Sequence, residues 1–174
     1  MSIFNLPLDR DGFVQALGDL YEHSPWVAAG TWDRLGGRGL DSLEAIHQAM
    51  NATLLAADHD RQLALIQAHP DLAGKAAVAG QLTAASTQEQ AGAGIHLCTP
   101  AEFARFTELN SAYKARFGFP FIMAVKGSDR HQILAAFERR IQHGASEEFR
   151  CALDEINKIA LFRLHALTPP KARP

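Results

Sequence analysis

The sequence has few of the features that mark secreted or membrane proteins. Only two cysteines occur among its 174 residues, Cys98 and Cys151, and they lie far apart without CxxC spacing. The first residues do not combine a charged segment with an apolar one, as a secretory signal does. No apolar run approaches the roughly 20 residues that a membrane-spanning helix needs. We therefore expect a cytoplasmic protein without membrane association.

The sequence also has no large excess of positive or negative charge, and it lacks the usual catalytic motifs. Lys and Arg number 17 against 19 Asp and Glu, so no basic field is available to bind nucleic acid. The eight histidines form no HxH or HExxH pattern, no GxSxG motif occurs, and no glycine-rich loop follows a strand pattern. The sequence therefore indicates neither a metal site, nor a catalytic serine, nor a dinucleotide cofactor.

The composition that remains is typical of a globular domain. Hydrophobic residues make up 47% and charged residues 21% of the chain, and its length suits one core. We predict a single domain over residues 1–167 and a loose, proline-containing tail over residues 168–174.

Apolar residues recur at helical intervals along the chain, and no segment alternates as a strand does, which predicts an all-α bundle of about seven or eight helices. The glycines of residues 36–39 predict a connector, and residues 119–125 an extended apolar segment around Pro120. The first helix is expected from Asp9 to near Glu22, the second begins after a Ser24 cap, and the third begins in the Asp41–Glu44 region. The next helix stops at His69, and short helices follow over residues 71–97. Three longer helices are expected from Thr99 to Gly118, from Ser128 to Gly144, and from Ser146 onward.

His69 is the first candidate for chemistry. Pro70 disfavours the helical conformation at the residue before it, so the helix should stop at His69 and its ring should project beside a glycine-containing loop. Taken alone, however, the dipeptide is more typical of a surface or helix-terminal histidine, which the helix dipole favours.

Four other polar residues have both a structural and a functional interpretation. Ser86 and Glu89 have the spacing of a capping box, which would explain both without any chemistry. Arg163 falls on the inward face of the last helix with no carboxylate three or four residues away, so it needs an ion pair from another helix or an anionic ligand. Asn110 interrupts an apolar stripe, and its amide is expected to bridge to the backbone of a turn rather than to a ligand.

Four motifs occur in an order and at spacings that resemble one family. They are the SPWVA run that begins at Ser24, the HPDLAGK run that begins at His69, Ser86-x-x-Glu89-Gln90, and Asn110-x-x-Tyr113 followed by residues 117–122 (FGFPFI). Together they resemble the 2-oxo-4-hydroxy-4-carboxy-5-ureidoimidazoline (OHCU) decarboxylase family of urate breakdown. The similarity runs from about Phe13 to Leu167. It departs from the family at Ala29-Gly30, where a charged residue is usual, and in its glycine-rich connector.

The resemblance implies an all-α homodimer that converts OHCU to (S)-allantoin, the last of three steps from urate, without a metal or an organic cofactor. The matching motifs assign catalytic roles to His69, Glu89 and Arg163. They also place Pro70, Ser86, Gln90 and the backbone of Phe121 and Ile122 along the substrate pocket.

The chemistry of OHCU agrees with this assignment. One ring carbon bears a carboxylate and a hydroxyl beside a C=N bond that can accept electrons, so no cofactor has to serve as an electron sink. We expect His69 to act as acid and base on the hydroxyl, and Glu89 to orient the ureido side and direct protonation. Arg163 should face an oxygen on which charge remains after decarboxylation. The alternatives are an inactive helical interaction module of a purine-catabolic complex and a ureide hydrolase, which would need an activated water.

Overall fold

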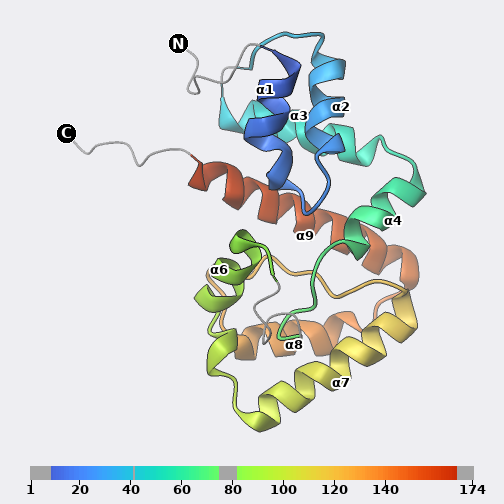
Figure 1. Ribbon diagram of the computed structural model, residues 1–174. Coiled ribbons are helices and arrows are strands. Elements are labelled where there is room, and N and C mark those ends of the chain that lie inside the picture. The colour runs from blue at the N-terminus through green and yellow to red at the C-terminus, as the bar shows by residue number, and fades with distance from the viewer. Residues whose placement is uncertain (1–8, 41, 75–81, 168–174) are drawn as a thin grey trace, which may run out of the picture. The chain divides into compact units, whose positions relative to one another are not determined.

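The computed structural model describes residues 9–40, 42–74 and 82–167. These residues form eight α-helices and two 3-10 helices and contain no strand, which confirms the all-α prediction (Figure 1). The tail at residues 168–174 lies outside the described residues, so its looseness stays a prediction. In chain order the elements are α1 (Arg10–Leu17), η1 (Gly18–Leu20), α2 (Trp26–Leu35), α3 (Leu43–Leu55), α4 (His59–Gln67), α6 (Ala84–Gly92), η2 (Ile95–Leu97), α7 (Pro100–Phe117), α8 (Arg130–Arg140) and α9 (Ala145–Ala166).

The chain divides into two compact units. Unit 1 consists of Met1–Leu65 and Asn157–Pro174, and unit 2 of Ile66–Ile156. The division falls inside α4 and inside α9, so each of these helices has residues in both units.

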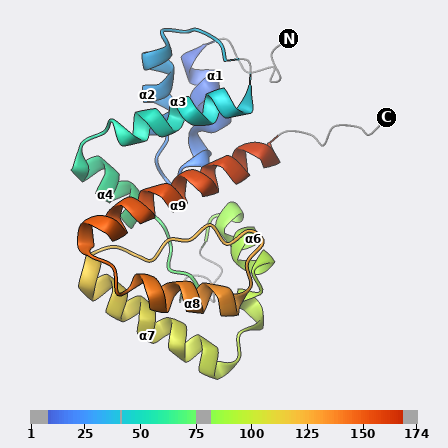
Figure 2. The ribbon, with the colours of Figure 1, turned by 180° about the vertical axis from the view of Figure 1, so that it is seen from behind.

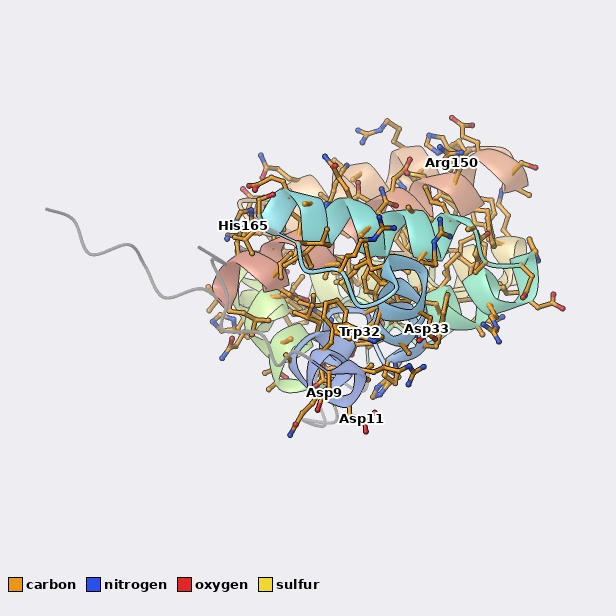
Figure 3. All side chains as sticks on the ribbon, turned by 90° about the horizontal axis from the view of Figure 1, so that it is seen from above. Asp9, Asp11, Trp32, Asp33, Arg150 and His165 are labelled. Carbon is orange, nitrogen blue, oxygen red and sulfur yellow. The ribbon has the colours of Figure 1, made fainter. Side chains whose placement is uncertain are left out.

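In unit 1, α2 packs against both α1 and α3. The rings of Phe13 and Trp32 lie 5.5 Å apart, and the Arg10 guanidinium donates two hydrogen bonds to the Asp33 carboxylate. Figure 3 labels Trp32 and Asp33 on α2 and Asp9 at the start of α1. Asp9 caps that helix, because its carboxylate accepts the Gly12 amide at 2.8 Å.

A close contact between α2 and α3 occurs at Gly30. A Cβ atom at Gly30 would lie only 3.0 Å from Cγ2 of Thr53, so a side chain at this position would require Thr53 to shift by a few tenths of an ångström. Beside this contact, the hydroxyls of Thr31 and Thr53 are 2.9 Å apart and both are buried. Glycine therefore permits the approach.

Unit 2 has an aromatic core between α7, α8 and the segment that connects them. Figures 1 and 2 show α7 and α8 side by side. The rings of Phe121 and Phe137 stack with centroids 3.9 Å apart, and Tyr113 meets both edge-on at 5.5 Å. Residues 119–125 are neither helix nor strand, as expected.

Several helix ends differ from the prediction by a few residues. The first helix ends at Leu17 and continues as the 3-10 turn η1, instead of reaching Glu22. Pro25, not Ser24, precedes α2, and Asp129, not Ser128, caps α8, because the Asp129 carboxylate accepts two backbone amides. Ser42 caps α3. The α8 helix ends at Arg140, four residues before Gly144. The predicted capping of α7 by Thr99 and its end at Gly118 are confirmed.

Candidate active site

His69 lies in a bend that follows α4 and is 9% exposed. The helix ends at Gln67, two residues earlier than predicted, and the His69 amide donates to the Ile66 carbonyl at 3.2 Å. The proline that follows prevents a return to helical geometry. His69 is therefore a buried residue on a defined loop, and the interpretation as a surface histidine at a helix end is wrong.

The loop that follows His69 turns tightly. Ala73 has a φ of +52°, a conformation that residues with a side chain rarely adopt. At Gly74 a Cβ atom would lie 2.6 Å from the Cβ of Asp71, so only glycine fits there. Such a turn persists only where its surroundings hold it.

Gln90 of α6 supplies part of that support. Its side-chain oxygen accepts the Ala73 amide at 3.1 Å, and its side-chain nitrogen donates to the Asp71 carbonyl at 3.3 Å. Gln90 is 5% exposed, so these bonds are shielded from water. The residue predicted to contact the substrate thus holds the His69 loop, and a substrate contact by Gln90 stays a prediction.

The α7 helix adds to this support. The Asn110 side-chain nitrogen donates to the Leu72 carbonyl at 2.8 Å, which confirms the expectation that Asn110 bridges to a turn. One turn further on, the Lys114 ammonium lies 2.7 Å from the Asp71 carboxylate in a more exposed pair. The His69 loop is therefore attached to two helices of unit 2.

Ser86 and Glu89 do not form the capping box that their spacing suggested. The cap of α6 is Thr83, whose hydroxyl accepts the Ser86 amide at 3.3 Å. Ser86 consequently occupies the third position of the helix and is buried, and Glu89 lies in the second turn, half-buried. The capping explanation for Glu89 is wrong. Gln90, the next residue, contacts the loop after His69.

The Phe121–Ile122 segment is held by a buried ionic cluster that the sequence pattern did not reveal. The Arg140 guanidinium donates to the Ile122 carbonyl at 2.6 Å and to the Glu148 carboxylate at 2.9 Å. Glu148, fully buried, also accepts the Tyr113 hydroxyl and lies 2.8 Å from Nδ1 of His143. The Phe121 side chain belongs to the core. The backbone of this segment is thus fixed in position, and its contact with a ligand stays a prediction.

Burial controls protonation within this cluster. Burial, together with the hydrogen bond to Glu148, raises the pKa of Tyr113, so its hydroxyl stays neutral and donates. Burial acts to lower the pKa of Arg140, but the hydrogen bonds and charge of Glu148 outweigh it, and the pKa is raised. Arg140 therefore remains a cation beside the Ile122 carbonyl.

Arg163 belongs to unit 1 and pairs with a carboxylate there. Its Nη1 donates to Oε2 of Glu22 at 2.9 Å, and the two side chains are 9% and 2% exposed. Arg163 therefore forms an ion pair, as one interpretation expected, but its partner lies in a turn and not on another helix. Its partner Glu22 was missed, although it stands two residues before the SPWVA motif. A helical period identifies an inward face but not the residue that the face meets.

The structure brings most of the predicted site residues into unit 2. These are His69, Pro70, Ser86, Glu89, Gln90, Phe121 and Ile122. Within residues 9–40, 42–74 and 82–167, no three His, Cys, Asp or Glu side chains are grouped so that they could hold a metal ion. Among the helices of the same ranges, none has the length and hydropathy to cross a membrane.

Comparison with known proteins agrees with the motifs. The family model described as OHCU decarboxylase matches residues 7–165. A 2-oxo-4-hydroxy-4-carboxy-5-ureidoimidazoline decarboxylase of Halalkalicoccus jeotgali is 44% identical, with 94% of this chain and 89% of the relative covered. The protein of the same name from Haloferax volcanii is 43% identical over 90% and 89%. A crystal structure of (S)-allantoin synthase has a TM-score of 0.74 and 33% identity; 95% of this chain is covered, but only 54% of that one.

Proposed function

The chain belongs to the OHCU decarboxylase family, and from this membership we propose that it releases the carboxylate of OHCU as carbon dioxide and forms (S)-allantoin in urate breakdown. It is then a carboxy-lyase of purine catabolism. The two similar archaeal proteins carry the name of this activity, and the chain spans 89% of each.

The observation that carries the proposal is the placement of His69. A buried imidazole stands on a loop whose backbone is bound by Gln90 and Asn110. Catalytic groups act best when the surrounding structure holds them before substrate arrives, since little ordering then remains to be done in the transition state.

In the proposed reaction the bond between the ring carbon and the carboxylate breaks, and its electron pair forms a C=C bond to the ureido-bearing carbon. The electrons of the former C=N bond move to the ring nitrogen, which takes up a proton. His69 takes the hydroxyl proton as that oxygen becomes the carbonyl of allantoin. The neighbouring ureido-bearing carbon gains a proton on one face, and Glu89 directs this step. A positioned acid or base contributes about 10²–10⁴-fold, or roughly 3–5 kcal/mol.

Arg163 is proposed to face an oxygen of the substrate on which charge remains after carbon dioxide has left. Its pairing with Glu22 offsets the positive charge of the guanidinium. A partly neutralised cation holds the ground-state carboxylate less tightly, and only interactions that strengthen in the transition state accelerate a reaction.

A homodimer in the cytoplasm, with one domain through residue 167, is also proposed. The dimer rests on the resemblance to the family. The compartment is supported by Cys98 and Cys151, which are both free, as is usual in a reducing environment. Light scattering after gel filtration should give twice the 19.0 kDa mass of the chain, and a monomer would contradict the dimer.

The test of the activity is to generate OHCU from urate in the cuvette and to follow optical rotation after adding the protein. Spontaneous decay gives racemic allantoin, whereas a stereospecific enzyme gives one enantiomer faster. His69→Asn, checked for folding by circular dichroism, should lose the acceleration by at least about 10²-fold. Racemic product at the uncatalysed rate from the parent protein would refute the function and favour an inactive interaction module.

A further inference from the structure

Asn110 is a buried amide in the middle of α7, between the aromatic residues Phe106 and Tyr113 of the same inward stripe. Its nitrogen donates to the Leu72 carbonyl at 2.8 Å. A carbonyl can only accept, so this contact also determines the orientation of the amide, with Oδ1 turned away from Leu72. That oxygen is buried and has no hydrogen-bond partner among the residues that the structure describes.

The half-satisfied amide does not make Asn110 a stabilising residue. An unsatisfied buried oxygen costs at least as much free energy as one hydrogen bond contributes to stability. The two contributions cancel at best. The benefit of asparagine at this position is therefore to be sought in what its one hydrogen bond holds.

That bond holds the carbonyl of the third residue after His69. Gln90 binds the Asp71 carbonyl and the Ala73 amide on either side, and Asn110 binds the Leu72 carbonyl between them. The other contact from α7, between Lys114 and Asp71, is partly exposed and is correspondingly weak. Asn110 is thus the shielded anchor through which α7 determines where the His69 loop lies.

We propose that Asn110 is a positioning residue for the reaction: it holds the His69 loop against α7 through the Leu72 carbonyl, and so sets the place of the imidazole. This inference rests on the proposed role of His69. A displacement of about 1 Å at a reacting group can cost 10²-fold in rate. Loss of the anchor should therefore lower kcat by about 10-fold or more and change KM little, because it disturbs a group that acts in the transition state.

The test compares Asn110→Ala and Asn110→Asp with a matched control, Asn51→Ala. Asn51 lies on α3 in unit 1, and its side-chain oxygen is also buried, with no hydrogen-bond partner in the described part of the chain. If removing a buried amide with an unpartnered oxygen were enough to lower kcat, Asn51→Ala should lower kcat as Asn110→Ala does. We expect wild-type kcat and KM from the control and the kcat loss from Asn110→Ala.

Asn110→Asp adds a readout that a purely structural role would not produce. A protonated carboxyl at this position can donate its O–H to the Leu72 carbonyl, whereas an ionised one can only accept and is repelled. Burial raises the pKa of such a carboxyl, so both forms occur within the usable pH range. The kcat of this variant, divided by that of the parent at each pH, should rise as the pH falls, and the same ratio for Asn110→Ala should stay flat.

Wild-type kcat in Asn110→Ala, or an Asn110→Asp profile parallel to that of the parent, would overturn the inference. If Asn110→Ala does not fold, as judged by circular dichroism, the profile of Asn110→Asp decides alone. A parent protein that fails to accelerate the reaction, or a fully active His69→Asn variant, would overturn both this inference and the proposed function. An active parent, an inactive His69→Asn variant and unaffected Asn110 variants would refute the role of Asn110 only.

Discussion

Arg163 and Glu22 form an ion pair from which water is almost excluded, and this pair changes how the arginine is understood. Before the structure, Arg163 could equally have been an empty anion receptor or one half of an internal pair. The 2.9 Å contact shows that it is paired. An anionic substrate group at this arginine would have to share it with Glu22.

Removal of one partner should therefore be far more harmful than removal of both. Glu22→Ala leaves a buried guanidinium without its carboxylate and should lower the free energy of unfolding by about 3–5 kcal/mol. The double variant Glu22→Ala/Arg163→Met buries no charge and should recover most of that loss. Urea denaturation of the three proteins measures both effects. Equal stability of Glu22→Ala and the parent would show that the pair contributes little.

At the level of the elements, α6 shows how a local pattern can mislead. Ser86 and Glu89 satisfy the spacing of a capping box, but the helix begins three residues earlier than that box requires, at Thr83. Thr83 and Ser86 both carry a hydroxyl that can cap a helix, so the sequence alone does not say where α6 begins. The ambiguity is resolved because the helix packs with Gln90 directed at the His69 loop.

Because Thr83 is the cap of α6 and Glu89 is not, one variant of this helix should change stability and another should change activity. Thr83→Ala removes the cap and should cost about 1 kcal/mol of stability, with the chemistry intact. Glu89→Gln should leave the melting temperature unchanged and lower kcat, since Glu89 is not the cap but is proposed to direct protonation. Differential scanning calorimetry and the optical-rotation assay on both variants check this. A Glu89→Gln protein that melts lower but turns over normally would contradict it.

Most helices could be predicted from their periodicity and their caps, and the errors lie at their ends. The Thr99 cap and Gly118 were correct because each carries a strong local signal, proline after the cap and glycine in the left-handed conformation. The end at Glu22 was wrong because Leu20 and Tyr21 are buried without being α-helical. Burial, not helical geometry, had produced their apolar period.

For the whole molecule, the two units share helices, since α4 and α9 have residues in each. Neither unit can unfold without breaking the hydrogen bonds of a helix that also belongs to the other. We therefore predict a single cooperative unfolding transition, as expected of one domain.

The distribution of tryptophan allows this prediction to be tested without labels. Both tryptophans, Trp26 and Trp32, lie in unit 1, so their fluorescence reports on that unit alone. Far-UV circular dichroism reports on the helices of both units. Urea curves from the two signals should coincide, and a fluorescence transition separate from the helix transition would show that the units unfold independently.

The sequence by itself determined the helical class, a helix end within two residues of His69-Pro70, the aromatic stripe of α7 and the family, because each follows from local periodicity, backbone restriction or a chain of motifs. Only the tertiary structure decided the partners: Glu22 for Arg163, Leu72 for Asn110 and Glu148 for Arg140. The physical reason is that a helical period states which side chains turn inward, whereas the hydrogen bonds they make depend on which backbone or charge is packed opposite.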